Sequence, residues 1–132
     1  MEVARLFSQK SVLIVDNSAE TREVLRIALA QRGTRTWEAT RPEQALELAR
    51  RHNPSVIVLD LEIAEQAAGA VQAGFSAAET AHTPIVLLGS ARGRTQNFPA
   101  GQFVTKPYHY GDLIRKIELL LDEARRPSVE SA

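Results

Sequence analysis

The chain has 132 residues, of which 44% are hydrophobic, and this size suits one domain that buries its own core. Its 16 Lys and Arg residues balance 16 Asp and Glu residues, so no net charge favours binding to nucleic acid or to an anionic membrane. The absence of cysteine excludes disulfides, thiolate catalysis and Cys-ligated zinc. No apolar stretch has the length of a membrane span or of a secretory signal core, so we expect a cytoplasmic protein.

Short apolar runs alternate with helical patterns along the chain. The runs at 12–15, 56–59, 85–89 and 103–105 are rich in Val, Ile and Leu and do not alternate with polar residues. Such continuous runs predict parallel strands that helices cover on both faces. A weaker strand is predicted at 34–39.

The first two helices are predicted from their caps. Ser18 is a candidate N-cap for a helix over residues 19–31, and Gly33 offers the left-handed residue that ends it. Thr40 and Glu43 have the spacing of a capping box at the start of the next helix.

The second half of the chain is less regular. After the run at 56–59, a loop beginning LEIAEQ leads into an alanine-rich helical pattern that extends to about residue 81. The segment 91–102 contains two glycines and a proline and is short for a regular helix. A last helix is predicted from Leu113 to about residue 126.

This order of elements predicts an α/β fold of three layers. We expect a flavodoxin-like, doubly wound parallel sheet of five strands in the order 2-1-3-4-5, with the fourth helix, between the fourth and fifth strands, short or missing. One domain is expected over residues 1–126, followed by a disordered tail at 127–132.

Four of the predicted strands are followed by, or lead directly into, a polar residue suited to phosphoryl chemistry: Asp16, Asp60, Ser90 and Lys106. The carboxyl ends of parallel strands share one edge of the sheet, so these side chains are expected to form a single site. Each has an ordinary alternative on its own: Asp16 as a helix cap, Asp60 as a turn residue, Ser90 as a loop residue and Lys106 as a surface lysine. Their joint occurrence favours the site.

The chemistry of such a site follows from the residue types. A carboxylate that attacks a phosphoryl group needs positive charge around the phosphoryl oxygens. Asp60 is the candidate nucleophile, and Asp16 is the candidate ligand for Mg²⁺. The Lys106 ammonium and the Ser90 hydroxyl are candidate donors to phosphoryl oxygens.

The residues at the strand ends resemble the receiver domains of two-component response regulators, including single-domain receivers of the chemotaxis type. The resemblance extends over about residues 10–126 and is carried by VLIVDN at 12–17, VIVLDL at 56–61, GSA at 89–91 and FVTKP at 103–107. It implies Asp60 as phosphoacceptor, Lys106 and Ser90 as catalytic residues, and a cis peptide before Pro107, where base rates alone favour trans. It also implies metal ligation by Asp16, Asn17, Asp60 and the backbone carbonyl of Glu62, and a switch formed by Ser90 and Phe103.

Three features depart from the family pattern. Asn17 occupies the place of a second acid, which removes one formal charge from the metal site. Glu62 lies two residues beyond the phosphoacceptor in a loop without the usual turn residues. Its carboxylate restores that charge, orients a hydrolytic water or faces solvent. The short segment 91–102 alters the surface on which Ser90 and Phe103 would act, and Phe103 has core packing as its alternative role.

We therefore expect a cytoplasmic single-domain receiver that is not an enzyme. It would accept a phosphoryl group on Asp60 from a histidine kinase or phosphotransfer protein, with Mg²⁺, and would signal by contact with a downstream protein, without binding nucleic acid or a membrane. The sequence leaves the oligomeric state open. The alternative is a pseudo-receiver, in which the same fold is a docking module independent of phosphorylation. A flavin or nucleotide binder is disfavoured because DNSAE, at 16–20, is not a glycine-rich turn and GSARGR, at 89–94, lacks the Walker spacing.

Overall fold

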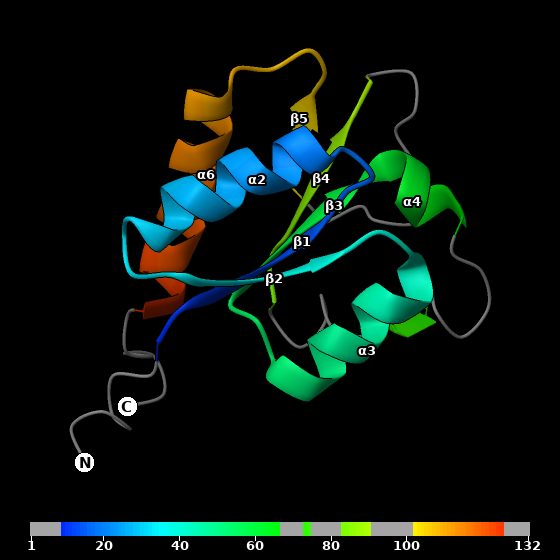
Figure 1. The fold of residues 1–132 in the computed structure, drawn as a ribbon, viewed down its shortest axis with the longest axis horizontal. Coiled ribbons are helices and arrows are strands. Elements are labelled where there is room, and N and C mark those ends of the chain that lie inside the picture. The colour runs from blue at the N-terminus through cyan, green and yellow to red at the C-terminus, as the bar shows by residue number, and fades with distance from the viewer. Residues whose placement is uncertain (1–8, 67–72, 75–82, 91–101, 126–132) are drawn as a thin grey trace.

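The computed structural model describes residues 9–66, 73–74, 83–90 and 102–125. Strands and helices alternate in most of this part of the chain (Figure 1). The described elements are β1 (Ser11–Val15), α2 (Ala19–Ala30), β2 (Arg35–Ala39), α3 (Pro42–His52), β3 (Val56–Asp60), α4 (Leu61–Gln66), β4 (Ile85–Gly89), β5 (Gln102–Thr105) and α6 (Tyr110–Arg125).

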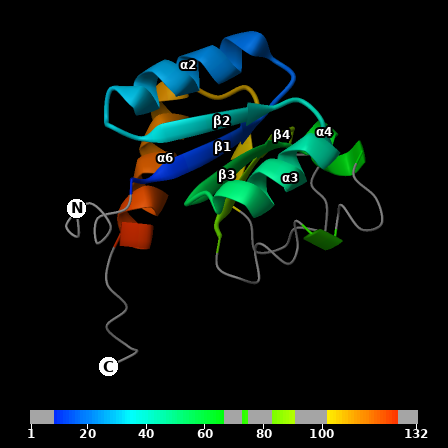
Figure 2. The same cartoon turned by 60° about the horizontal axis from the view of Figure 1, so that its bottom comes forward.

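The five strands form one parallel sheet in the order β2-β1-β3-β4-β5. Helices α2 and α6 cover one face of the sheet, and α3 and α4 cover the other (Figures 1 and 2). The predicted fold class, with three layers and this strand order, is confirmed. The predicted strands agree with the observed ones to within one residue at each end.

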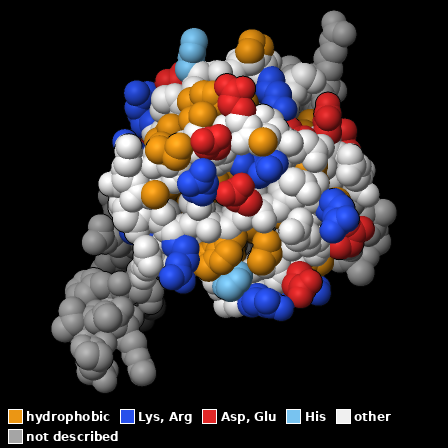
Figure 3. Space-filling model, in the orientation of Figure 1, with side chains coloured by type: hydrophobic (Ala, Val, Ile, Leu, Met, Phe, Trp, Pro, Cys, Tyr) orange, Lys and Arg blue, Asp and Glu red, His pale blue; other side chains and the backbone are white. Residues whose placement is uncertain are grey.

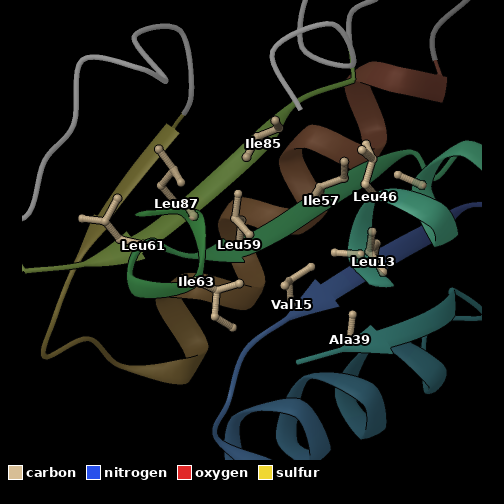
Figure 4. Close-up of a cluster of buried hydrophobic side chains, with 13 residues drawn as sticks. Leu13, Val15, Ala39, Leu46, Ile57, Leu59, Leu61, Ile63, Ile85 and Leu87 are labelled. Carbon is tan, nitrogen blue, oxygen red and sulfur yellow. The ribbon is translucent and has the colours of Figure 1, made fainter. Parts of the chain in front are cut away.

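Two separate apolar cores explain why the strands carry no polar alternation. Successive side chains of a strand point to opposite faces, so Leu13 and Val15 lie in one core while Val12 and Ile14 lie in the other. The first core joins the sheet to α3 and α4 through residues such as Leu46 (Figure 4). The second core joins the sheet to α2 and α6. With both faces covered, β1, β3 and β4 are buried along their whole length.

The helix ends confirm one predicted cap and correct the other. The Ser18 hydroxyl accepts a hydrogen bond from Thr21 N at 3.1 Å, and Gly33 has a φ of 76°, as predicted. The capping box predicted for Thr40 and Glu43 is wrong. Pro42 is the first residue of α3, which makes Arg41 the N-cap without a side-chain hydrogen bond, and Gln44 Oε1 accepts from Thr40 N instead.

The segment after Asp60 also differs from the prediction. The residues expected to form a loop begin helix α4 directly at Leu61. Leu61, Ile63 and Ala64 are buried against the sheet, and this burial explains why the chain turns into a helix without an intervening loop.

Several predicted features lie outside the described residues. These are most of the alanine-rich helix up to residue 81, the short segment between β4 and β5, and the tail at 127–132. Four helices are described, and none of them is both long and apolar enough to cross a membrane.

Candidate functional site

The register of the sheet brings the predicted site residues to one edge. Val15 is level with Leu59 in the β1–β3 pair, so Asp16 and Asp60 follow in the same row. In the β4–β5 pair Gly89 is level with Thr105, so Ser90 and Lys106 follow these two strands in the same row. A hydrogen bond of 2.8 Å from Lys106 N to Gly89 O fixes the backbone at that point.

Lys106 and Asp60 form an ion pair between the ends of β5 and β3. Lys106 Nζ donates to Asp60 Oδ1 at 2.8 Å, and the exposed fractions of the two side chains are 42% and 5%. Burial lowers the pKa of Lys106, but the hydrogen bond to Asp60 and the negative charges of Asp60 and Asp16 outweigh it and raise the pKa above its usual value. Lys106 is therefore a cation that is held directly on the candidate nucleophile.

Asp16 provides a second buried carboxylate beside this pair, with an exposed fraction of 3%. Its Oδ1 accepts a hydrogen bond from Ser18 N at 2.8 Å, whereas Oδ2 is buried and has no hydrogen-bond partner among the residues that the structure describes. Burial raises the pKa of Asp16, the charge of Asp60 raises it further, and the Ser18 hydrogen bond and the positive charges of Lys106 and Arg22 only partly oppose this. The charged form of the Asp16 carboxyl is therefore disfavoured at this buried position.

This arrangement fits a small divalent cation. A buried carboxylate oxygen without a partner, close to a second carboxylate, is a donor set that suits Mg²⁺. Among the described residues no group of three or more acidic or histidine side chains gathers, in keeping with Asn17 in place of a second acid. Asp16 and Asp60 are thus the two side chains that would hold the ion.

The other predicted metal contacts stay predictions. Asn17 and Glu62 are both exposed. Glu62 lies in helix α4, and its backbone carbonyl stays a predicted metal contact.

The predicted switch residues lie on neighbouring strands. Ser90 is exposed immediately after β4, and Phe103 is half-buried in β5, level with Leu87 and packed against the core on the α3 and α4 side. Core packing of Phe103 is confirmed, while its switch role stays a prediction. The Lys106–Pro107 peptide is cis, as the resemblance implied.

A group of polar residues behind Asp16 was missed from the sequence. Arg22 Nη1 donates to Asp16 O at 2.8 Å, and Thr21 Oγ1 lies 3.2 Å from Tyr110 OH, which links α2 to α6. Tyr108 packs edge-on against Tyr110 at 5.9 Å between ring centroids, and burial raises the pKa of Tyr108. The only signal in the sequence is that Thr21 and Arg22 fall in the first turn of a helix that starts beside Asp16.

Comparison with known proteins agrees with this geometry. The family model described as response regulator receiver domain matches residues 12–118. The curated "Transcriptional regulatory protein SrrA" of Staphylococcus aureus is 28% identical over 126 residues, which cover 92% of this chain and 52% of SrrA. The chain thus spans about half the length of the curated relatives it matches.

Solved structures show the same fold. A response regulator receiver modulated diguanylate cyclase from Pelobacter carbinolicus is similar at a TM-score of 0.68 and 26% identity, with 87% of this chain and 94% of that chain covered. The chemotaxis response regulator CheY4 of Vibrio cholerae is similar at a TM-score of 0.69 and 20% identity, with 86% and 99% covered. With the family match over most of its length, the chain belongs to the response regulator receiver domain family of two-component signalling.

Proposed function

We propose that Asp60 accepts a phosphoryl group from the phosphohistidine of a histidine kinase or phosphotransfer protein. The observation that carries this proposal is the 2.8 Å contact between Lys106 Nζ and Asp60 Oδ1, with the buried and unpaired Asp16 Oδ2 beside it. A nucleophile, a cation for the phosphoryl oxygens and a metal-binding carboxylate thus meet at one edge of the sheet.

The transfer itself needs no further protein nucleophile. A carboxylate oxygen of Asp60 attacks phosphorus, the bond from phosphorus to the histidine nitrogen breaks, and the electron pair stays on that nitrogen. The Lys106 side chain, which is 42% exposed, moves from Asp60 to a phosphoryl oxygen and stabilises the charge that develops there. The Ser90 hydroxyl donates to another oxygen after transfer.

Asp16 and Asp60 hold Mg²⁺ in this proposal. When bound, the ion supplies the positive charge that two buried carboxylates and an anionic donor require. The ion would offset the charge of both carboxylates and so relieve their mutual repulsion.

The output is proposed to be contact with a downstream protein, in the cytoplasm and without enzymatic activity of the receiver itself. The face of the molecule seen in Figure 3 has acidic and basic side chains interspersed, without a broad basic patch of the kind that binds DNA. SrrA is named a transcriptional regulatory protein, and this role belongs to SrrA.

A pseudo-receiver is the second candidate function. The observation that favours it is Asn17, which is exposed where the family has an acid and leaves two carboxylates at the site among the described residues. In that case the domain would bind its partner without a phosphoryl group.

Intact mass spectrometry after incubation with acetyl phosphate separates the two functions. With Mg²⁺ we expect one phosphoryl group on the wild type and none on Asp60→Asn. Asp112→Asn is the matched control, because Asp112 is an exposed carboxylate of α6 that pairs with Arg115, whereas Lys106 pairs with Asp60. An unlabelled wild type, under conditions that label an ordinary receiver, would refute phosphoryl transfer and favour the docking module.

A further inference from the structure

Arg22 in α2 makes two charged hydrogen bonds in different directions. Its Nη1 donates to the backbone carbonyl of Asp16 at 2.8 Å, and its Nε donates to Glu38 Oε1 at 3.0 Å. The Arg22 side chain has an exposed fraction of 20%, so these bonds are partly shielded from water. The guanidinium therefore ties the end of β1 to the edge strand β2.

This contact completes a set of restraints on Asp16. Asp16 N donates to Ala39 O at 3.1 Å, Asp16 O accepts from Arg22, and Asp16 Oδ1 accepts from Ser18 N at 2.8 Å. The remaining polar atom, Oδ2, is buried and has no hydrogen-bond partner in the described part of the chain. Every polar group of Asp16 is thus fixed, apart from the one oxygen that is left for a cation.

Glu38 gives the arginine a fixed place. A lone guanidinium near the site would compete with a metal ion for the two carboxylates, whereas the Glu38 carboxylate gives Arg22 an acidic partner on β2. The planar fork of arginine also suits two partners in different directions better than a lysine ammonium does.

We propose that Arg22, anchored by Glu38, is a positioning residue that aims the Asp16 carboxylate at the metal site. It acts through Asp16 and touches neither the metal nor the phosphoryl group. With Asn17 in place of a second acid, the direction of this one carboxylate decides metal affinity to a greater extent. The proposal rests on the proposed function only in that Asp16 binds Mg²⁺.

Arg26 provides a matched control one helical turn further along α2. Its Nε lies 3.5 Å from Glu38 Oε2, its exposed fraction is 48%, and Glu38 is its side-chain partner in the part of the chain that the structure describes. Removing Arg26 deletes one positive charge and one bond to Glu38, as removing Arg22 does. Only the Arg22 change deletes the bond to Asp16.

The test compares Arg22→Gln with Arg26→Gln in the full chain, with Mn²⁺ as the probe. Electron paramagnetic resonance of free Mn²⁺ gives the affinity, and competition gives that for Mg²⁺. We expect Arg22→Gln to weaken Mn²⁺ binding about tenfold and Arg26→Gln to leave it nearly unchanged. Arg22→Lys, which keeps a donor for the Asp16 carbonyl, should recover part of the loss. Thermal unfolding confirms that each variant is folded at the temperature of the titration.

A second readout needs no metal. The amide signal of Ser18, which donates to Asp16 Oδ1, should shift in the ¹⁵N–¹H spectrum of metal-free Arg22→Gln and stay in place in Arg26→Gln. The positioning role is overturned if this signal is unchanged in Arg22→Gln, or if both variants lose equal affinity through charge alone. A wild type that binds no Mn²⁺ and takes up no phosphoryl group instead contradicts the proposed function, and the Ser18 signal still decides the role of Arg22.

Discussion

The substitution Asp16→Asn is expected to stabilise the folded protein in the absence of metal. Asp16 is 3% exposed, its Oδ2 has no hydrogen-bond partner within the described ranges, and its charge is repelled by that of Asp60. Asparagine keeps an oxygen for the Ser18 N–H and removes the formal charge. The change therefore deletes a cost of the folded state without deleting the hydrogen bond that orders the loop.

The size of the effect follows from the charge that is removed, because the amide nitrogen of asparagine takes the place of Oδ2 and is itself a buried polar atom. The desolvation penalty of a buried polar group is about 1–3 kcal/mol and is larger for a charged group, so the free energy of unfolding should rise by about 1 kcal/mol. For a domain of this length each kcal/mol corresponds to a shift of about 3–5 °C in Tm. An increase of several degrees is thus expected for the variant at neutral pH.

The dependence on pH has a definite sign. The pKa of Asp16 is raised in the folded state, so folding is penalised at every pH above that raised value, where the carboxylate must be charged. As the pH falls through the raised pKa toward the ordinary value of 3.8, the folded protein binds the proton first and the penalty disappears. The advantage of Asp16→Asn should shrink over the same range.

Thermal unfolding with and without Mg²⁺ measures both parts of this prediction. Mg²⁺ should raise the Tm of the wild type, by the equivalent of about 2.7 kcal/mol at a hundredfold excess over Kd, and should leave Asp16→Asn nearly unchanged. The reasoning is refuted if metal-free Asp16→Asn is less stable than the wild type at neutral pH. It is also refuted if Mg²⁺ stabilises the variant as strongly as the wild type.

Two further substitutions test the surroundings of Asp60. Lys106→Gln leaves the Asp60 carboxylate buried without its cation and should lower the free energy of unfolding by about 1–2 kcal/mol. The loss is smaller than for a fully buried pair because the Lys106 side chain is 42% exposed. Urea unfolding measures the loss, and an unchanged midpoint would contradict it. The same variant should take up phosphoryl from acetyl phosphate far more slowly, as followed by intact mass. Gly89→Ala would place a Cβ 2.7 Å from the Cβ of Leu61, the residue after Asp60, and should lower the free energy of unfolding by about 1–3 kcal/mol. Gly111→Ala is the control, because a Cβ at that position has no described atom within 4 Å. Equal stability of the two alanine variants would argue against this packing.

The strand ends were predictable because the signal is local. Strands β1, β3 and β4 each consist of five consecutive buried residues. A polar residue follows β1 and β4 directly and is the last residue of β3. Parallel strands in a doubly wound sheet bring such ends together whatever the helices contribute. Asp16, Asp60 and Lys106 could therefore be placed at one site from the sequence.

The features that were missed depend on packing between distant segments. Arg22 meets Glu38 only because α2 packs beside β2, and no periodic pattern in the sequence predicts that contact. Helix α4 begins at Leu61 because Leu61 and Ile63 find apolar surface on the sheet, which overrides the loop that the sequence favoured. The start of α3 was misplaced because Pro42 fixes the first helical residue more firmly than a capping-box spacing does.

Chemical identification of the modified side chain tests the central claim most directly. After incubation with acetyl phosphate and Mg²⁺, borohydride reduces an acyl phosphate of aspartate to homoserine, and peptide mass spectrometry locates it. The account predicts homoserine at position 60, only when Mg²⁺ is present and strongly reduced in Lys106→Gln. Homoserine at position 16, or none anywhere under conditions that modify another receiver, would contradict it.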